Sequence, residues 1–330
     1  MKRLLIACGC LCLLAACHHK PSLQSRIERW DPRLDSLVSP DAHAEVIACG
    51  YHWTEGPLWD PAGQRLLFSD VPANAIYQWT ETGGASLYLK PSGYTDTVRR
   101  GGETGSNGLA FDLQGRLVLC QQGNRQVARM EAPLNQPAPV FRALAARYQN
   151  KRFDSPNDLV LSRSGDLFFT DPPYGLEKYV DDPAKDAPYQ GVYRVKPDGR
   201  ILLLCDTLTR PNGIGFMPGG RTLVVANSDP EKAIWYAFDL ADPDSLTHAR
   251  ILYDATAAGR KDSGSPDGFK IDSHGNLFGT GPGGIWIIDS TGRALGRIRI
   301  PGRISNCAFT PDERTLFVTA DSCVLRIRLR

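Results

Sequence analysis

Short apolar runs alternate with turns along almost the whole chain, and one arrangement of them recurs six times. Each copy reads as a polar residue, an apolar strand of about five residues, a turn with Gly or Asp, and a second apolar strand. The polar residues that open the copies are Glu55, Asn107, Asn157, Asn212, Asp267 and Asn306. Most copies start about 50 residues apart, a spacing typical of proteins that repeat one supersecondary unit.

The intervals between the copies add further strands and no convincing amphipathic helix. Examples are residues 75–89, "AIYQWTETGGASLYL", and residues 191–204, "GVYRVKPDGRILLL". About four short strands per copy predict an all-β fold, a six-bladed β-propeller with one blade per copy. Only three strands follow Asn306, so residues 44–53, "AEVIACGYHW", are expected to supply the outer strand of the last blade and close the ring.

Residues 1–17 have a different pattern. Lys2 and Arg3 precede an apolar run over residues 4–16, which is typical of an export signal. The run is shorter than the roughly 17 residues that a membrane-spanning helix needs. Residues 14–17, "LAAC", resemble a bacterial lipoprotein box, which implies that Cys17 is lipidated and becomes the first residue of the mature chain.

These features predict the cellular location and the domain organisation. We expect a lipid-anchored protein of the cell envelope that faces the periplasm and contacts the membrane only through its anchor. His18 after the lipidated cysteine favours the outer membrane. Residues 18–42 are then a tether, and residues 43–330 form a single propeller domain.

Composition excludes some functions. With 42% hydrophobic and 22% charged residues the chain can build a large core. The formal net charge of +2, without a basic run, argues against nucleic acid as a partner. Beyond residue 17 the cysteines are Cys49, Cys120, Cys205, Cys307 and Cys323. No Cys-x-x-Cys spacing occurs among them, which argues against a zinc site; one disulfide is compatible with an oxidising compartment, and its pairing is open.

The inner strands of a propeller line its central channel, so equivalent positions of the repeat converge on the axis. The six polar residues would then form a ring of oxygen ligands. Asn-Gly, Asn-Asp and Asp-Gly are also common turn dipeptides, and each copy taken alone could use its polar residue only to turn the chain. Glu55 is a poor turn former, and the agreement of all six copies favours a metal site. Such ligands suit Ca²⁺, accept Mg²⁺ or Mn²⁺, and suit Zn²⁺ least.

Short motifs at these positions resemble the gluconolactonase and SMP-30 (regucalcin-like) family of six-bladed propeller lactonases, in particular its bacterial gluconolactonase branch. They are "EGPLW" from Glu55, "SPNDLV" from Ser155, "TDPPYG" from Thr170, "RPNGIGF" from Arg210 and "SPDGF" from Ser265. The resemblance implies that Glu55, Asn212 and Asp267 bind the metal, with Asn157 as a further ligand or a substrate contact, and that Asp267 is the general base. The vertebrate branch has Arg where Ser155 stands here, two residues before the matching Asn.

The hypothesis is a divalent-metal-dependent lactonase that hydrolyses gluconolactone-like sugar lactones to aldonic acids. The metal would polarise the lactone carbonyl, and Asp267 would orient or deprotonate the attacking water. Asn107, Asn157 and Asn306 are candidate substrate contacts. Asp171 and Tyr174, in the "TDPPYG" segment, are further candidates at the channel entrance.

Two alternatives stay open. One is a non-catalytic propeller that binds an envelope partner and holds calcium as a structural ion. The other is a phosphotriesterase or aryl esterase, whose relatives use paired histidines. Only His52 lies near the repeat positions, and the chain has no Gly-x-Ser-x-Gly elbow for a serine nucleophile. The identity of the lactone and the oligomeric state are not predicted.

Overall fold

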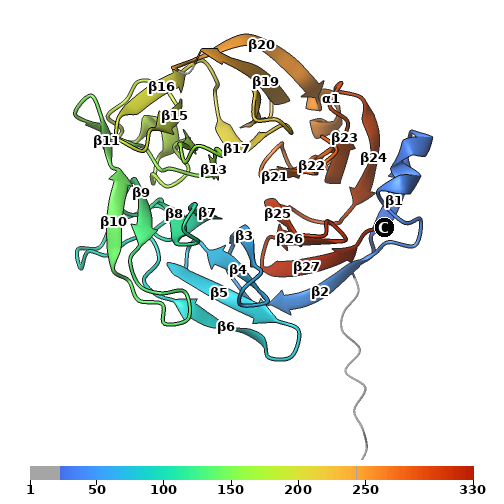
Figure 1. Cartoon of the computed structure of the whole chain (residues 1–330), viewed down its shortest axis with the longest axis horizontal. Coiled ribbons are helices and arrows are strands. Elements are labelled where there is room, and N and C mark those ends of the chain that lie inside the picture. Colours follow the sequence, from blue (N-terminus) through green and yellow to red (C-terminus); the bar gives the residue numbers. More distant parts are fainter. Residues whose placement is uncertain (1–22, 243) are drawn as a thin grey trace, which may run out of the picture.

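The computed structural model describes residues 23–242 and 244–330, which form a β-propeller of six blades around a central channel (Figure 1). Each blade is an antiparallel sheet whose first strand lies nearest the axis. The six-bladed all-β prediction is confirmed. No helix in the described residues is long and apolar enough to cross a membrane.

Four blades consist of consecutive strands. Blade 1 comprises β3 (Thr54–Asp60), β4 (Arg65–Asp70), β5 (Ala75–Thr80) and β6 (Gly84–Leu89). Blade 2 comprises β7 (Ser106–Phe111), β8 (Leu117–Gln121), β9 (Gln126–Met130) and β10 (Phe141–Ala145). Blade 3 comprises β13 (Leu159–Leu161), β14 (Leu167–Asp171), β15 (Gly191–Val195) and β16 (Ile201–Cys205). Blade 4 comprises β17 (Pro211–Phe216), β18 (Thr222–Asp229), β19 (Lys232–Asp242) and β20 (Ser245–Asp254).

The last two blades each add a strand from the N-terminal segment. Blade 5 comprises β21 (Phe269–Ile271), β22 (Leu277–Gly281), β23 (Gly284–Ile288), β24 (Ala294–Arg299) and β1 (Arg26–Arg29). Blade 6 comprises β25 (Asn306–Phe309), β26 (Thr315–Ala320), β27 (Cys323–Arg328) and β2 (Ala44–Cys49). A small hairpin pairs β11 (Arg147–Tyr148) with β12 (Lys151–Arg152). The helical turns are η1 (Pro32–Ser36), η2 (Tyr179–Asp181) and α1 (Thr256–Gly259).

The ring is closed as expected, by a strand from residues 44–53. β2 pairs antiparallel with β27, so that Ala44 lies opposite Ile327. At the other end of the pair a disulfide joins Cys49 to Cys323, whose Cα atoms are 4.1 Å apart. The two ends of the propeller are therefore held by a ladder of main-chain hydrogen bonds and by one covalent bond.

Part of the segment assigned to the tether is integrated into the fold. β1 adds a fifth strand to the outer edge of blade 5, with Ile27 opposite Ile298. After it, Leu34 and Val38 are buried in the apolar layer between blades 5 and 6. The predicted signal segment and Cys17 lie outside the described residues.

The core is a series of apolar layers between neighbouring blades rather than one central cluster. Between blades 6 and 1, for example, Leu66 and Phe68 pack with Phe317, which stacks on Trp59 at a centroid distance of 5.3 Å. Each large apolar side chain buried in this way contributes about 1.5–3 kcal/mol. The channel itself needs no apolar filling, so its wall can carry polar side chains.

Candidate metal and substrate site in the channel

The six polar repeat residues lie at the same end of the inner strands. Glu55, Asn107 and Asn212 are the second residues of β3, β7 and β17, and Asn306 is the first residue of β25. Asn157 and Asp267 stand two residues before β13 and β21. Residues at the same position of the repeat therefore lie at the same level along the channel axis.

The glycines that follow several of these residues serve close packing, not turns. Asn107 and Gly108 lie within β7, and the Gly108 N–H donates to the Asn157 carbonyl at 2.8 Å. A Cβ atom on Gly108 would lie 2.7 Å from that same carbonyl oxygen, and one on Gly268 would lie 2.0 Å from the Asn306 amide carbon. The inner strands approach each other too closely here for a larger residue. The turn interpretation therefore fails for the Asn-Gly pair of β7.

Five of the six residues line one cavity of about 530 Å³ at the mouth of the channel. They are Glu55, Asn107, Asn157, Asn212 and Asp267. The same cavity is lined by Glu103, from the loop before β7, and by Tyr174, from the loop after β14. Carboxylate and amide groups from five blades thus converge on a space large enough for a small molecule.

Four carboxyl groups crowd the site, and burial is the main cause of their altered titration. Burial raises the pKa of Glu55 to about 8 and that of Glu103 to about 7. It also raises the pKa of Asp158, and it places the pKa of Asp267 well above the usual range, with repulsion from Glu55 and Asp158 adding to the effect. Without a cation these groups tend to keep their protons, and a divalent cation would favour their ionised forms.

The polar atoms fit a hard cation. Asn107 Oδ1 and Asp267 Oδ1 are buried and accept no hydrogen bond from any described residue. Orphaned acceptors of this kind are rare in folded proteins and suit an oxygen-liganded cation. Within residues 23–242 and 244–330, no three His, Cys, Asp or Glu side chains form a metal cluster by themselves. An ion held here would therefore depend on the Asn amides as well as on Glu55 and Asp267.

The structure does not bring Asn306 or Asp171 to the cavity, although both were expected to contact substrate. The Asn306 amide lies against two acids: Nδ2 donates to Asp158 Oδ2 at 3.4 Å, and the side chain also hydrogen-bonds with the Glu55 carboxyl group. The two oxygens of Asp171 accept the N–H groups of Asp154 and Ser155, each at 2.8 Å. Asp171 thus holds the loop that carries Asn157, because its acceptors are occupied by backbone donors.

Other sequence candidates take distinct places. Tyr174 lines the cavity, and burial raises the pKa of its hydroxyl, which hydrogen-bonds with Ser228 and Arg210. Ser155 is buried; its hydroxyl donates to the Pro172 carbonyl at 2.6 Å and accepts from the Gly175 N–H at 2.8 Å. It ties the loop before β13 to the loop after β14. The His52 side chain is 73% exposed and does not line the cavity.

Two buried acids at the site were not identified from the sequence. Glu103 lies in a loop outside the repeated strands, so no periodicity marks it. Asp158 carried a signal, because it stands where most other copies have a small residue after the polar one. Because that position is closely packed in the other copies, an acid there indicates a buried carboxyl group.

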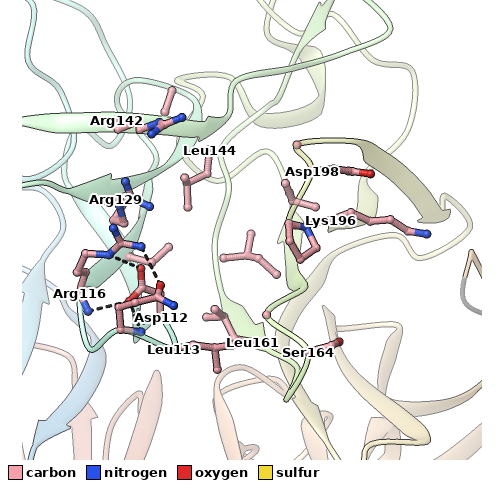
Figure 2. Close-up of a pocket in the computed structure, with 18 residues that line it drawn as sticks. Asp112, Leu113, Arg116, Arg129, Arg142, Leu144, Leu161, Ser164, Lys196 and Asp198 are labelled. Carbon is pink, nitrogen blue, oxygen red and sulfur yellow. Dashed lines mark hydrogen bonds and ion pairs between the residues drawn. The ribbon is translucent and has the colours of Figure 1, made fainter.

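A second cavity of about 540 Å³ lies at the opposite ends of the inner strands, between blades 2 and 3. Figure 2 shows Arg116, Arg129 and Arg142 along one wall and Lys196 on the other. Most of these cations are already neutralised. The ion pairs are Arg116 with Asp112 at 2.7 Å, Arg129 with Glu131 at 2.7 Å, and Lys196 with Asp244. The channel cavity, with its unpaired buried oxygens, is the stronger candidate for chemistry.

Comparison with known proteins identifies the family of the chain. The family model described as "SMP-30/Gluconolactonase/LRE-like region" matches residues 53–322. A gluconolactonase of Zymomonas mobilis is 39% identical over 312 residues, covering 92% of this chain and 86% of that protein. A solved gluconolactonase of Xanthomonas campestris superposes with a TM-score of 0.80 at 29% identity, covering 94% of this chain and 96% of the other. A calcium-binding regucalcin of Agrobacterium tumefaciens has a TM-score of 0.67 at 17% identity, covering 86% and 93% of the two chains, a likeness that shows the fold alone.

Proposed function

Because the chain belongs to the SMP-30 and gluconolactonase family, we propose that it is a divalent-metal-dependent lactonase that hydrolyses gluconolactone-like sugar lactones to aldonic acids. The observation that carries this proposal is the convergence of Glu55, Asn107, Asn157, Asn212 and Asp267 on one cavity at the channel mouth. The names of the relatives support the reaction class, a lactone ester hydrolysis.

Glu55, Asn212 and Asp267 would hold the cation, with Asn157 as a further ligand. When bound, the cation supplies Lewis-acid chemistry, because it withdraws electrons from a lactone carbonyl and offsets developing negative charge. The oxygen-only ligand set favours Ca²⁺, with Mg²⁺ and Mn²⁺ as substitutes and Zn²⁺ as the poorest fit.

The protein's own groups supply proton transfer and orientation. Ionised Asp267 accepts a proton from, or orients, the water that attacks the carbonyl. One of its oxygens, Oδ1, accepts no hydrogen bond from the described part of the chain, which leaves it available to a ligand or to water. The Asn107 amide, whose Oδ1 is also unpartnered, can accept from a substrate hydroxyl, and the Tyr174 ring covers one side of the cavity. Asp171 and Ser155 keep the Asn157 loop in place.

We also propose that the protein is exported and anchored through Cys17 in the cell envelope, facing the periplasm, with the outer membrane as the favoured site. The Cys49–Cys323 disulfide supports export, because such bonds form and persist in oxidising compartments.

The function is tested by comparing Asp267→Asn with the wild type on D-glucono-1,5-lactone, with spontaneous hydrolysis subtracted. Loss of a general base typically lowers kcat by about 100-fold or more. Asp312→Asn, in an exposed turn, is the matched control. Unchanged hydrolysis by Asp267→Asn would overturn the assignment. Faster turnover of a phosphotriester than of any lactone would instead favour the esterase alternative.

A further inference from the structure

Glu103 is a partly buried acid at the cavity, and no described residue neutralises it. Its side chain lines the same cavity as Glu55 and Asp267. Among the described residues no hydrogen bond or ion pair holds its carboxyl group. Burial alone raises its pKa, to about 7. A carboxyl group that opens onto a cavity without a protein partner is available to accept hydrogen bonds from a bound ligand.

The loop that carries Glu103 is fixed by its neighbours. The Gly105 N–H donates to the Val71 carbonyl of blade 1 at 2.8 Å, and the Gln122 N–H of blade 2 donates to the Gly105 carbonyl at 3.1 Å. Arg100 donates to the Gly175 carbonyl of blade 3 at 2.6 Å. A Cβ atom on Gly105 would lie 2.3 Å from the Val71 oxygen, so the backbone has no room to shift. These contacts hold the backbone on both sides of Glu103 at the edge of the cavity.

Glu103 belongs to the wall of the cavity and not to the ring of repeat residues. In three blades the residue two positions before the ring residue also lines the cavity: Trp53, Ser265 and Ile304. Glu103, four positions before Asn107, lines it from blade 2. A molecule bound over the ring would thus meet Glu103 from the side.

We propose that Glu103 is a specificity-determining residue that accepts hydrogen bonds from the hydroxyl groups of a polyhydroxylated lactone. The inference rests on the proposed function and adds a substrate preference to it. A sugar lactone provides the donors that the carboxyl group lacks, whereas a lactone without hydroxyl groups leaves that group unpaired. The site accordingly selects hydroxylated lactones over bare ones.

The test compares Glu103→Gln and Glu103→Ala with the wild type on D-glucono-1,5-lactone and on δ-valerolactone, at saturating Ca²⁺. Loss of a hydrogen bond to a charged acceptor is expected to raise KM for gluconolactone by about 10-fold or more and to change kcat little. The kcat/KM for δ-valerolactone should stay the same. Glu231→Gln, exposed in the turn between β18 and β19 on the same face, is the matched control.

Several results would overturn this role. An equal loss on both lactones would place Glu103 at the reaction centre, and no loss on either would exclude a substrate contact. Calorimetric titration with Ca²⁺ should give the same affinity for Glu103→Gln and the wild type; a 10-fold weaker affinity would make Glu103 a metal ligand instead. If the wild type hydrolyses neither lactone, the proposed function fails, and calorimetry with D-gluconate decides separately whether Glu103→Gln weakens polyol binding.

Discussion

Removing the Cys49–Cys323 disulfide is expected to destabilise the propeller without changing its fold. The bond joins positions 274 residues apart, so it constrains almost the whole unfolded chain. The chain-entropy relation gives about 5.6 kcal/mol for a loop of this size, and measured losses on removing native disulfides are about 2–5 kcal/mol. Replacing Cys49 removes little buried apolar surface, because its side chain is exposed. The β2–β27 ladder and the buried Val46 and Leu325 beside it remain to close the ring.

The assay is urea unfolding of the double variant Cys49→Ala/Cys323→Ala at fixed Ca²⁺ concentration. Its free energy of unfolding should fall by about 2–5 kcal/mol. A reducing agent should lower the free energy of unfolding of the wild type to that of the double variant. It should leave the free energy of unfolding of the double variant unchanged. Cys205→Ala, at a free and half-buried cysteine, controls for the loss of a thiol. Equal unfolding free energies of the double variant and the oxidised wild type would refute the claim that the disulfide stabilises the closed ring.

Two further predictions concern buried charge. In chelator-treated protein the pKa of Glu55 is about 8 in the folded state and 4.5 in the unfolded state. The folded protein therefore binds the extra proton between these pH values, and the free energy of unfolding should fall as the pH rises from 4.5 to about 8. Urea unfolding should show this slope, and Glu55→Gln should reduce it; a slope of the opposite sign would contradict the account. Arg297 pairs with Glu28 of β1 at 2.7 Å and with Asp262 at 2.8 Å. Arg297→Met should cost about 1.5–3 kcal/mol, because it removes the buried partner of both acids and leaves them only the more exposed Arg26 and Arg299. The exposed Arg26→Met is its control, and similar losses for the two variants would exclude a special role for the cluster.

The repeat made the architecture predictable, because strand and turn signals agree in every copy. Closure by residues 44–53 followed from counting strands after Asn306. β1 could not be foreseen, because "RIER" is short and three of its four residues are charged. It is a strand here because blade 5 offers it an edge and Arg297 offers Glu28 a partner. The disulfide likewise depends on ring closure, which brings Cys49 and Cys323 together from opposite ends of the chain.

The candidate site was predictable where it follows the repeat, and at Tyr174 from the "TDPPYG" segment. Glu55, Asn107, Asn157, Asn212 and Asp267 share a position in the copies and therefore share the cavity. Asn306 shares the position too, yet its amide is directed to Asp158, a contact that needs the folded neighbours to be seen.

Whether a metal in the channel drives lactone hydrolysis is tested most directly by one titration. The protein is stripped with chelator, and hydrolysis of D-glucono-1,5-lactone is followed by proton release as Ca²⁺, Mg²⁺, Mn²⁺ or Zn²⁺ is restored. We expect no turnover above the spontaneous rate without metal, and recovery with Ca²⁺ that Asp267→Asn lacks. Full turnover in the stripped protein, or a metal that raises thermal stability and restores no turnover, would contradict a metal-dependent lactonase.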